Sequence, residues 1–380
     1  MIAVANKIVN SSDFLCGLSG TLWPLHLKPK PQELLSSWII RFSHAHCYKS
    51  ETICTILFGY RSPVWNRDVD KLAPEYVLNK MIEVTGATVE QAYNTVLLSY
   101  QNYLTINFNS QGNTRWILPL GIVHRSRSRP SLMYCPQCFA EDSIPYYRKL
   151  WRVAWVTVCS KHKIRLLDTC SSCGAIVMPH RADMRIKNSI PNENTLIHCF
   201  NCGISLAKGK NIKASSNLTR WQRKMERAAY LGYLKWQENP SLYSFLFFDG
   251  VRELSLVLMR QMKGAPSVKR EIEFVDLDYR YKVMTDIAQI LARWPVAFRA
   301  YVKKQKLSYS YLKNYDLDCL PYWYECEIKT MTKKYSNISD IEAQAIRDYV
   351  IKKTGIFSET YARTFSGRDL SGHLSNGEEQ

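Results

Sequence analysis

Apolar residues recur at helical spacing near the start of the chain, after a stiff segment of alternating lysine and proline at residues 28–31. The pattern predicts one helix around Trp38 and a second that runs from Ser50 to a stop at Gly59. Two short helices with a tight link are typical of a helix-turn-helix, although any pair of neighbouring helices gives the same pattern. We therefore expect a helical, helix-turn-helix-like domain here.

Two more helices are predicted in the same region, over residues 74–85 and 88–103. Gly86 suits the end of the first, because glycine readily adopts the left-handed conformation that closes many helices. Thr88 and Gln91 have the spacing of a capping box, which predicts the start of the second.

The pattern becomes irregular in the middle of the chain. Residues 115–125 are mixed but largely apolar, and residues 151–159 fit a buried strand or a short helix equally well. The polar residues 180–195 predict an exposed insertion, and the basic residues 207–216 predict a linker.

Helical spacing returns in the last part of the chain. Helices are predicted from about Leu218, within residues 242–262 and over residues 281–292. A capping box at Ser339 opens a further helix, and a short one over residues 358–365 would complete a second helix pair.

These patterns predict a mainly α-helical, multidomain protein. We expect an N-terminal helical domain over residues 1–114, a central domain over 115–206, a C-terminal helical domain over 207–366 and a disordered tail over 367–380. No apolar run is long enough to span a membrane.

The positive charge of the chain is concentrated in its middle. The 380 residues carry a net charge of +18, yet residues 1–114 contain nine basic and eight acidic residues. Residues 115–235 contain 21 basic and six acidic residues, and residues 236–380 contain 21 and 19. A localised positive field of this kind is expected for a protein that binds a polyanion.

The densest basic run, residues 124–129, alternates arginine with serine, a pattern that supplies guanidinium forks and hydroxyl donors for phosphate. We favour nucleic acid over a solvated loop or an acidic protein surface as its partner. A membrane surface is less suitable, because no amphipathic helix accompanies the run. The candidate nucleic-acid contacts are Arg125, Arg127, Arg129, Arg115, Arg148, Lys149 and Arg152.

Four half-sites of the form Cys-x-x-Cys or Cys-x-x-His lie within the same basic region. Two half-sites can supply the four ligands of one closed tetrahedral Zn²⁺ site, so four predict two structural zinc ions. The candidate ligands are Cys135, Cys138, Cys159, His162, Cys170, Cys173, Cys199 and Cys202.

The sequence leaves the pairing of the half-sites open. We favour sequential pairing, in which the first two half-sites share one ion and the last two share the other. In the alternative, cross-braced arrangement, the first would join the third, but the seven residues between His162 and Cys170 are long for that. His180 and His198 are spare histidines nearby, for which a solvated loop position is the simpler interpretation.

Other roles for these cysteines fit less well. A disulfide framework requires export, and Lys7 and Asp13 interrupt the apolar core that a secretory signal would need, so we expect reduced thiols. A redox motif would lie between a strand and a helix, and a catalytic zinc would have only three protein ligands. The other five cysteines are simplest as buried apolar residues: Cys16, Cys47, Cys54, Cys319 and Cys326.

No motif of an enzyme stands out. The chain has no His-Glu-x-x-His and no nucleophile elbow, and the glycines at 203 and 209 do not have the spacing of a phosphate-binding loop. The acidic pairs Asp276/Asp278 and Asp316/Asp318 could serve a two-metal nuclease, but solvated surface carboxylates are the simpler interpretation. We therefore expect a protein without catalytic activity.

The zinc region resembles that of the TniQ/TnsD family. The matching motifs are Tyr134-Cys135-Pro136-x-Cys138, Glu141-Asp142, Tyr146-Tyr147-Arg148, Trp151-Arg152, Cys159-x-x-His162 and Cys170-x-x-Cys173-Gly174. Upstream, the resemblance extends to Pro29-x-Pro31-x-Glu33-x-Leu35-x-Ser37-Trp38-x-x-Arg41 and Gly112-Asn113-x-Arg115-Trp116. It is close over about residues 24–205 and loose elsewhere.

This resemblance implies a non-catalytic target selector of Tn7-like transposons in the bacterial cytoplasm, associated with the nucleoid. Such a protein would bind an AAA+ ATPase that recruits the transposase. It would either read target DNA itself or associate, in some cases as a homodimer, with a CRISPR effector ribonucleoprotein. The resemblance leaves both modes open. A zinc-stabilised, sequence-specific DNA-binding regulator that acts without an ATPase is the alternative.

Overall fold

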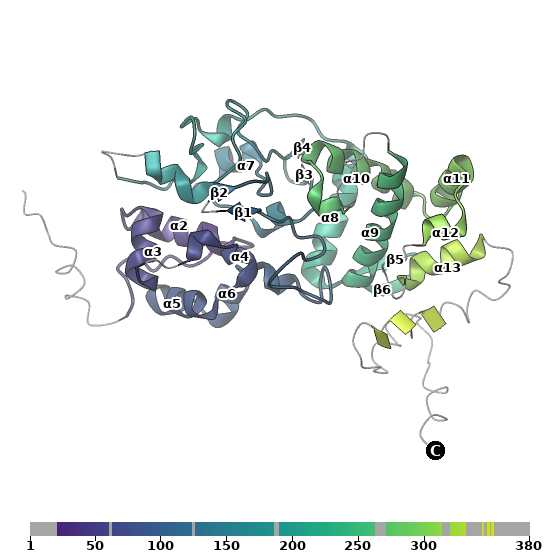
Figure 1. Ribbon diagram of the computed structural model, residues 1–380, viewed down its shortest axis with the longest axis horizontal. Helices are drawn as coiled ribbons and strands as arrows, with labels where there is room; N and C mark the ends of the chain where they lie inside the picture. Colours follow the sequence, from purple (N-terminus) through teal and green to yellow (C-terminus); the bar gives the residue numbers. More distant parts are fainter. Residues whose placement is uncertain are drawn as a thin grey trace, which may run out of the picture.

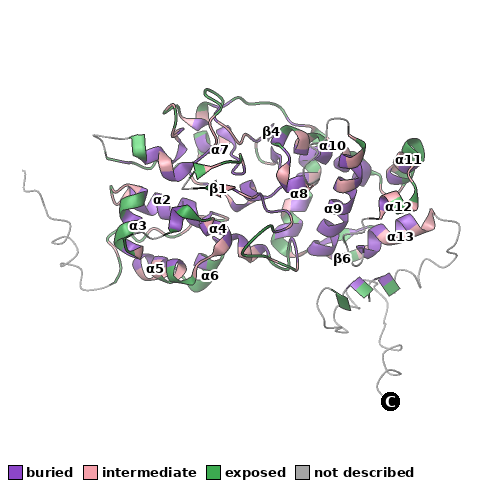
Figure 2. Cartoon of the chain, in the orientation of Figure 1, coloured by how far each residue is buried: buried purple, intermediate pink, exposed green. Residues whose placement is uncertain are grey.

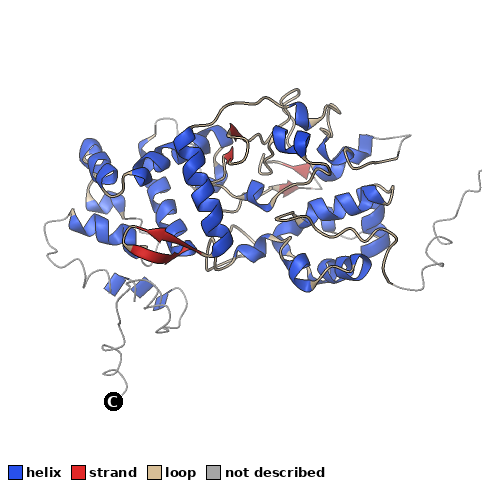
Figure 3. Cartoon of the chain, turned by 180° about the vertical axis from the view of Figure 1, so that it is seen from behind, coloured by secondary structure: helices blue, strands red, loops and turns tan. Residues whose placement is uncertain are grey.

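The computed structural model describes residues 21–60, 63–123, 126–185, 190–262, 271–313 and 320–331, together with 344–345, 348–349 and 351–352. The protein is mainly helical and multidomain, as predicted, and the described strands form three short antiparallel hairpins among the helices (Figure 3). Short helices lie at one end of the molecule, a cysteine-rich segment with little regular structure follows, and longer helices lie at the other end (Figure 1).

The N-terminal part is a group of short helices. Its α-helices are α2 (Leu35–Ala45), α3 (Ser50–Phe58), α4 (Val69–Leu72), α5 (Glu75–Thr85) and α6 (Val89–Tyr93), with 3₁₀ helices η1 (Val64–Asn66) and η2 (Leu97–Tyr100). The predicted capping box is present, because Gln91 N–H donates to Thr88 Oγ1 and Thr88 N–H to Gln91 Oε1. The prediction of one helix over 88–103 is wrong, since α6 ends at Tyr93 and only a 3₁₀ turn follows.

The central part has almost no regular structure. Its elements are β1 (Ile122–Val123), β2 (Ser126–Arg127), α7 (Pro136–Glu141), η3 (Lys149–Arg152), β3 (Val158–Cys159), β4 (Ile164–Arg165), η4 (Pro179–Arg185), η5 (Thr195–Ile197) and η6 (Leu206–Lys208). Residues 151–159, which fitted a strand or a helix, form neither throughout: η3 ends at Arg152 and β3 begins at Val158.

The C-terminal part is built on longer helices. It comprises α8 (Ser216–Leu231), the hairpin of β5 (Tyr233–Trp236) and β6 (Asn239–Tyr243), α9 (Ser244–Gln261), η7 (Ile272–Phe274), α10 (Leu277–Ala292), α11 (Val296–Gln305), α12 (Tyr309–Leu312) and α13 (Tyr322–Thr330). Aromatic rings fill its core, where Trp236 contacts Trp294, Trp323 and Phe247 at centroid distances of 5.0–6.1 Å. Buried residues run through both ends of the molecule and the segment between them (Figure 2).

Contacts cross the predicted boundary at residue 114. Buried Glu33 pairs with Arg41 through two hydrogen bonds of 2.7 Å and accepts a third from Ser37 Oγ at 2.8 Å. Ser37 Oγ in turn accepts from Tyr147 N–H at 2.9 Å, and Leu34 N–H donates to the Tyr147 carbonyl. The charged motif that precedes α2 therefore binds the central segment as well as its own helix.

The predicted exposed insertion at residues 180–195 is exposed in part, but its first residues pack against the N-terminal helices. Buried Asp183 in η4 accepts hydrogen bonds from Ser50 N–H at 2.7 Å and Ser50 Oγ at 2.6 Å, and lies 3.1 Å from His44 Nε2. Although burial alone would raise its pKa, these donors hold the pKa of Asp183 below its ordinary value. The prediction is therefore wrong for the residues around Asp183, whose carboxylate caps the start of α3, while residues 184–185 and 192–194 are exposed as predicted.

The predicted basic linker at residues 207–216 also has defined structure. Arg165 N–H donates to the Ile212 carbonyl and Ala214 N–H to the Lys163 carbonyl, so this strip runs beside β4 before α8 begins. Ser215 accepts from Leu218 N–H and caps α8. Sequence alone could not show this, since the strip is polar and its partner lies some fifty residues earlier.

Several predictions concern residues outside the described ranges. They include the Ser339 capping box, the helix over residues 358–365, the tail from residue 367, Cys16, Cys319 and the pair Asp316/Asp318. Within the described ranges, no helix combines the length and apolar character needed to cross a membrane.

Candidate metal centres and basic surfaces

The first cysteine cluster joins the start of α7 to the β3–β4 turn. Cys135 is the N-cap of α7 and Cys138 lies in its first turn, while Cys159 ends β3 and His162 precedes β4. Reciprocal backbone hydrogen bonds between Tyr134 and Leu167, at 2.7 and 2.9 Å, hold the two half-sites together.

The spacing of the ligand atoms in this first cluster suits a tetrahedral zinc ion. His162 Nδ1 lies 3.3 Å from Cys135 Sγ and 3.4 Å from the sulfurs of Cys138 and Cys159. The Cys138 and Cys159 sulfurs are 3.7 Å apart. Typical Zn–S and Zn–N bonds would place two sulfurs about 3.8 Å apart and a sulfur and nitrogen about 3.6 Å apart.

Glu141 supports this histidine from outside the cluster. His162 Nε2 lies 2.9 Å from Glu141 Oε2, while Nδ1 faces the three sulfurs. Hydrogen bonds from Lys161 and then His162 hold the pKa of Glu141 below its ordinary value. A carboxylate that accepts from the outer nitrogen fixes the histidine tautomer a metal needs, so the arrangement suits a metal ligand.

The second cluster is built from two similar turns. Cys170 N–H donates to the Ala175 carbonyl and Cys199 N–H to the Ile204 carbonyl, at 2.8 and 2.9 Å. In each turn a glycine with positive φ follows the second cysteine, with φ of 70° at Gly174 and 78° at Gly203. Only glycine adopts this conformation without strain, so the Cys-x-x-Cys-Gly pattern specifies the turn that points both sulfurs inward.

The second cluster also gathers four possible ligands. Cys170 Sγ lies 3.7 Å from Cys202 Sγ, and Cys173 Sγ lies 3.6 Å from Cys199 Sγ. The four sulfurs lie within 4.8 Å of one another. Both clusters follow the sequential arrangement, and the eight predicted ligands, seven cysteines and one histidine, all belong to one or the other.

These geometries differ from those of the alternative roles. The sulfurs are far beyond the roughly 2.05 Å of a disulfide bond, and the cysteines are free thiols. Neither spare histidine joins a cluster, because His180 stacks on Trp65 with ring centroids 5.0 Å apart and His198 Nδ1 lies 2.8 Å from the Asn194 carbonyl. Two closed clusters of four residues therefore could each hold a metal ion.

Residues 24–166 match the TniQ family model. The chain carries a TniQ domain. No curated protein matches the chain.

The TniQ domain contains the whole first cluster and ends directly after β4. It also contains Glu33, Ser37 and Arg41, whose buried hydrogen bonds bind Tyr147. All four residues of the second cluster lie beyond the match. The TniQ domain associates the chain with target selection in transposition, and so with the DNA and protein partners of transposons in general.

Two predicted nucleic-acid contacts lie inside the TniQ domain, away from its surface. Arg152 is 1% exposed and forms two hydrogen bonds to Asp68, at 3.1 and 2.6 Å. Lys149 is 2% exposed, and its Nζ donates to Ser99 Oγ at 2.7 Å. Burial lowers the pKa of Lys149 to about 7. Both cations hold the N-terminal helices against the central segment, and neither is placed to reach a phosphate.

Two further candidates are partly exposed and already paired. Arg148 donates twice to Asp142, at 2.9 Å each, and its guanidinium lies over the rings of Tyr146 and Trp151. Arg115 lies 3.5 Å from Asp249. A phosphate would have to compete with these carboxylates, so both are weaker candidates than the sequence indicated.

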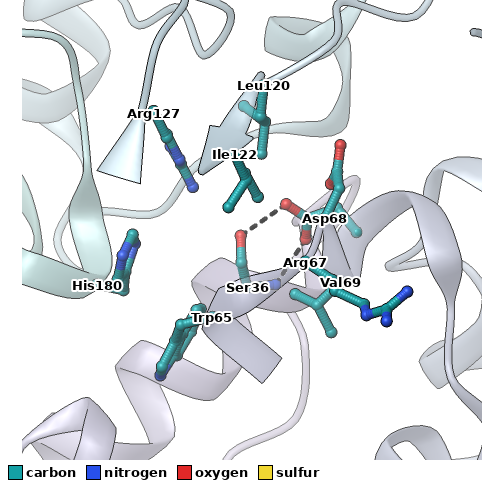
Figure 4. Close-up of a pocket in the computed structure, with 10 residues that line it drawn as sticks. Ser36, Trp65, Arg67, Asp68, Val69, Leu120, Ile122, Arg127 and His180 are labelled. Atoms are coloured by element: carbon teal, nitrogen blue, oxygen red, sulfur yellow. Dashed lines mark hydrogen bonds between the residues drawn. The ribbon is translucent and has the colours of Figure 1, made fainter. Parts of the chain in front are cut away.

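The arginine–serine run divides into different environments. Arg127 points into a small pocket beside Trp65 and His180 (Figure 4), where its Nη1 donates to the Val177 carbonyl at 2.9 Å. Burial lowers the pKa of Arg127 to about 10. Arg129 is exposed and lies over the ring of Phe274, while Arg125 falls outside the described residues.

The outer face of α8 is a basic surface that the sequence analysis missed. Arg220, Arg223, Lys224 and Arg227 are all exposed there. Their spacing of three, four and seven residues could have revealed the surface.

Proposed function

We propose that this protein is a non-catalytic adaptor for target selection in DNA transposition. In this role it binds target nucleic acid or a CRISPR effector complex and recruits an AAA+ ATPase and the transposase. The observation that carries the proposal is a TniQ domain whose buried first cluster lies between the N-terminal helices and α8. The domain supports the class of function, and the buried cluster supports a rigid scaffold without a reactive centre.

We further propose that the two clusters bind structural Zn²⁺. Each offers four protein ligands, which leaves no open coordination position for substrate. The ligands would be Cys135, Cys138, Cys159 and His162 in one site, and Cys170, Cys173, Cys199 and Cys202 in the other. Bound zinc would fix the turns of the central segment, which has little regular structure of its own.

Affinity capture of the full-length chain from cells that carry the whole transposon tests the adaptor role. We expect an AAA+ ATPase in the captured material with wild-type protein, identified by mass spectrometry. If a CRISPR effector is recovered together with the ATPase, targeting is guided by RNA. If one DNA segment is recovered with the ATPase but without an effector, the protein recognises the target DNA itself. Capture of DNA without any ATPase would contradict the adaptor role and support the DNA-binding regulator.

Elemental analysis of the same protein tests the metal. We expect two zinc ions per chain in the wild-type protein. The variants Cys138→Ser and Cys173→Ser should each contain one zinc ion. A chain that contains no zinc, or a variant of one cluster that loses both ions, would contradict two independent structural sites.

A further inference from the structure

Helix α8 has one buried and one cationic face. The buried face packs inward through Leu218, Thr219, Gln222, Met225, Ala228 and Ala229. Arg220, Arg223, Lys224 and Arg227 occupy the opposite face, and all four are exposed. Because residues three and four apart are neighbours on a helix, these side chains form one stripe, about 10 Å long from first to last. We call this stripe the α8 basic face.

Basic residues also flank α8 along the sequence. Residues 207–236 contain eight lysines and arginines and one acidic residue, Glu226. Glu226 turns inward, where it accepts from Ser160 Oγ at 2.6 Å and from Gln222 Nε2 at 2.7 Å. The other four cations, all exposed, are Lys208, Lys210, Lys213 and Lys235.

These eight cations lack carboxylate partners among the residues that the structure describes. Such a concentration of like charge destabilises the free protein by self-repulsion, and a polyanion would relieve it. The surface therefore has the electrostatic character of a phosphate-binding face.

The first cluster fixes the position of this helix. Gln222 Oε1 accepts from the N–H groups of Thr157 and Val158 at 3.0 Å each. Arg223 Nη2 donates to the Ser160 carbonyl at 2.8 Å, in the turn between Cys159 and His162. The cations are thus presented from a helix that is clamped to a metal-binding turn, which limits the freedom lost on binding.

We propose that the α8 basic face binds the phosphate backbone of double-stranded DNA. The inference deepens the proposed function, because it names a surface through which a target-selection protein would hold its target. The stripe from Arg220 to Arg227 is about 10 Å long, a length over which one strand of a DNA duplex presents about three phosphates. Of the aromatic rings on α8, Trp221 is half-buried beneath Lys224, whose Nζ lies 4.7 Å from the ring centroid, and Tyr230 lies beyond Arg227. A single strand would need a series of exposed rings along the stripe on which successive bases stack.

Binding of a 30-base-pair duplex of arbitrary sequence, measured by fluorescence anisotropy over a salt series, tests the proposal on the full chain. The variant Arg220→Gln/Lys224→Gln/Arg227→Gln leaves the Arg223 contact to Ser160 intact. Each lost phosphate contact lowers the slope of log K against log salt by about 0.9, so we expect a fall of about 2 to 3. The single variant Arg227→Gln should lower the slope by about 1.

A matched control removes the same charge elsewhere. Lys303, Lys304 and Lys306 are exposed on α11 and the residue after it, at the far end of the C-terminal part (Figure 1). The variant Lys303→Gln/Lys304→Gln/Lys306→Gln should change the slope by less than 1. Zinc content and melting temperature of both triple variants are measured alongside.

Several results would overturn the proposal. They are an unchanged slope in the α8 variant, an equal fall in the α11 control, or tighter binding of an RNA duplex than of DNA. Loss of a captured protein with unchanged DNA affinity would reassign the face to that partner. The adaptor role is tested separately. If the wild-type chain captures no ATPase but the α8 variant still has a lower salt slope, the DNA-binding surface stands and the adaptor role is wrong.

Discussion

The two cysteine clusters share a ligand arrangement but differ in how deeply the fold encloses them. In the first, the three cysteines are between 0% and 8% exposed, and Glu141, Gln222 and Arg223 contact its histidine or its turn. In the second, Cys173 is exposed and Cys202 is half-buried. The first cluster is thus enclosed by the core, whereas the second has two buried sulfurs, those of Cys170 and Cys199, and is open to solvent at the other two.

This difference indicates that a bound metal would have a different role in each cluster. At the first cluster it would hold together segments that the N-terminal helices and α8 both pack against. At the second it would chiefly order its own two turns and the residues between them. The TniQ match includes the first cluster and excludes the second, which agrees with this division.

The largest effect is expected from Cys138→Ser in the first cluster. Structural zinc contributes on the order of 10 kcal/mol to folding, more than most domains can lose. We therefore expect cooperative loss of the native fold in both the N-terminal and central parts, measured by circular dichroism and hydrogen exchange. A variant that lacks the metal yet unfolds at the wild-type temperature would contradict a central role for this cluster.

Cys173→Ser in the second cluster should have a smaller, local effect. Loss of its metal is expected to raise hydrogen exchange and protease cleavage over residues 168–206, while α8 to α10 keep their protection. If Cys173→Ser instead unfolds the whole protein as Cys138→Ser does, the two clusters do not differ in their contribution to the fold.

Gln222→Ala tests the enclosure of the first cluster without touching a ligand. The change leaves the buried N–H groups of Thr157 and Val158 without an acceptor, each of which costs about 1–3 kcal/mol. We expect a destabilisation of about 2–4 kcal/mol by denaturant titration. The exposed Gln237, changed to Ala, is the control and should alter stability by less than about 0.5 kcal/mol.

Glu141→Gln should have the smallest effect and should weaken metal binding without unfolding the protein. Loss of a carboxylate behind a ligating histidine typically reduces metal affinity 10- to 100-fold. Competition with a chelator should therefore release one zinc ion earlier than in wild type, and only from the first cluster. Equal release from both clusters would show that Glu141 does not act through His162.

The sequence predicted features that depend on local chemistry. The capping box at Thr88, the end of α5 at Gly86 and the four half-sites all follow from short-range spacing. The roles of Arg152 and Asp183 could not be predicted, because each side chain meets partners more than 80 positions away in the chain. A basic residue near a metal motif looks the same in sequence whether it faces solvent or a buried carboxylate.

The same limit explains the candidate nucleic-acid residues. The arginine–serine run is conspicuous in the sequence, yet Arg127 points into the protein. The four cations of α8 are spread over eight positions and become a single stripe only when the helix is formed. The helical spacing of these four charged residues in the sequence is the signal that predicts the stripe.

The docking of Asp183 on Ser50 has a consequence for how metal and fold depend on each other. Asp183 lies on a stretch of about 25 residues whose two ends belong to the second cluster. With both ends tied, that stretch samples few conformations, so its carboxylate meets α3 at high effective concentration. Release of the ion would free the two ends of this stretch and lower the effective concentration of the Asp183 carboxylate at α3. Metal binding at the second cluster and the contact of Asp183 with α3 would therefore be reciprocally linked, each strengthening the other.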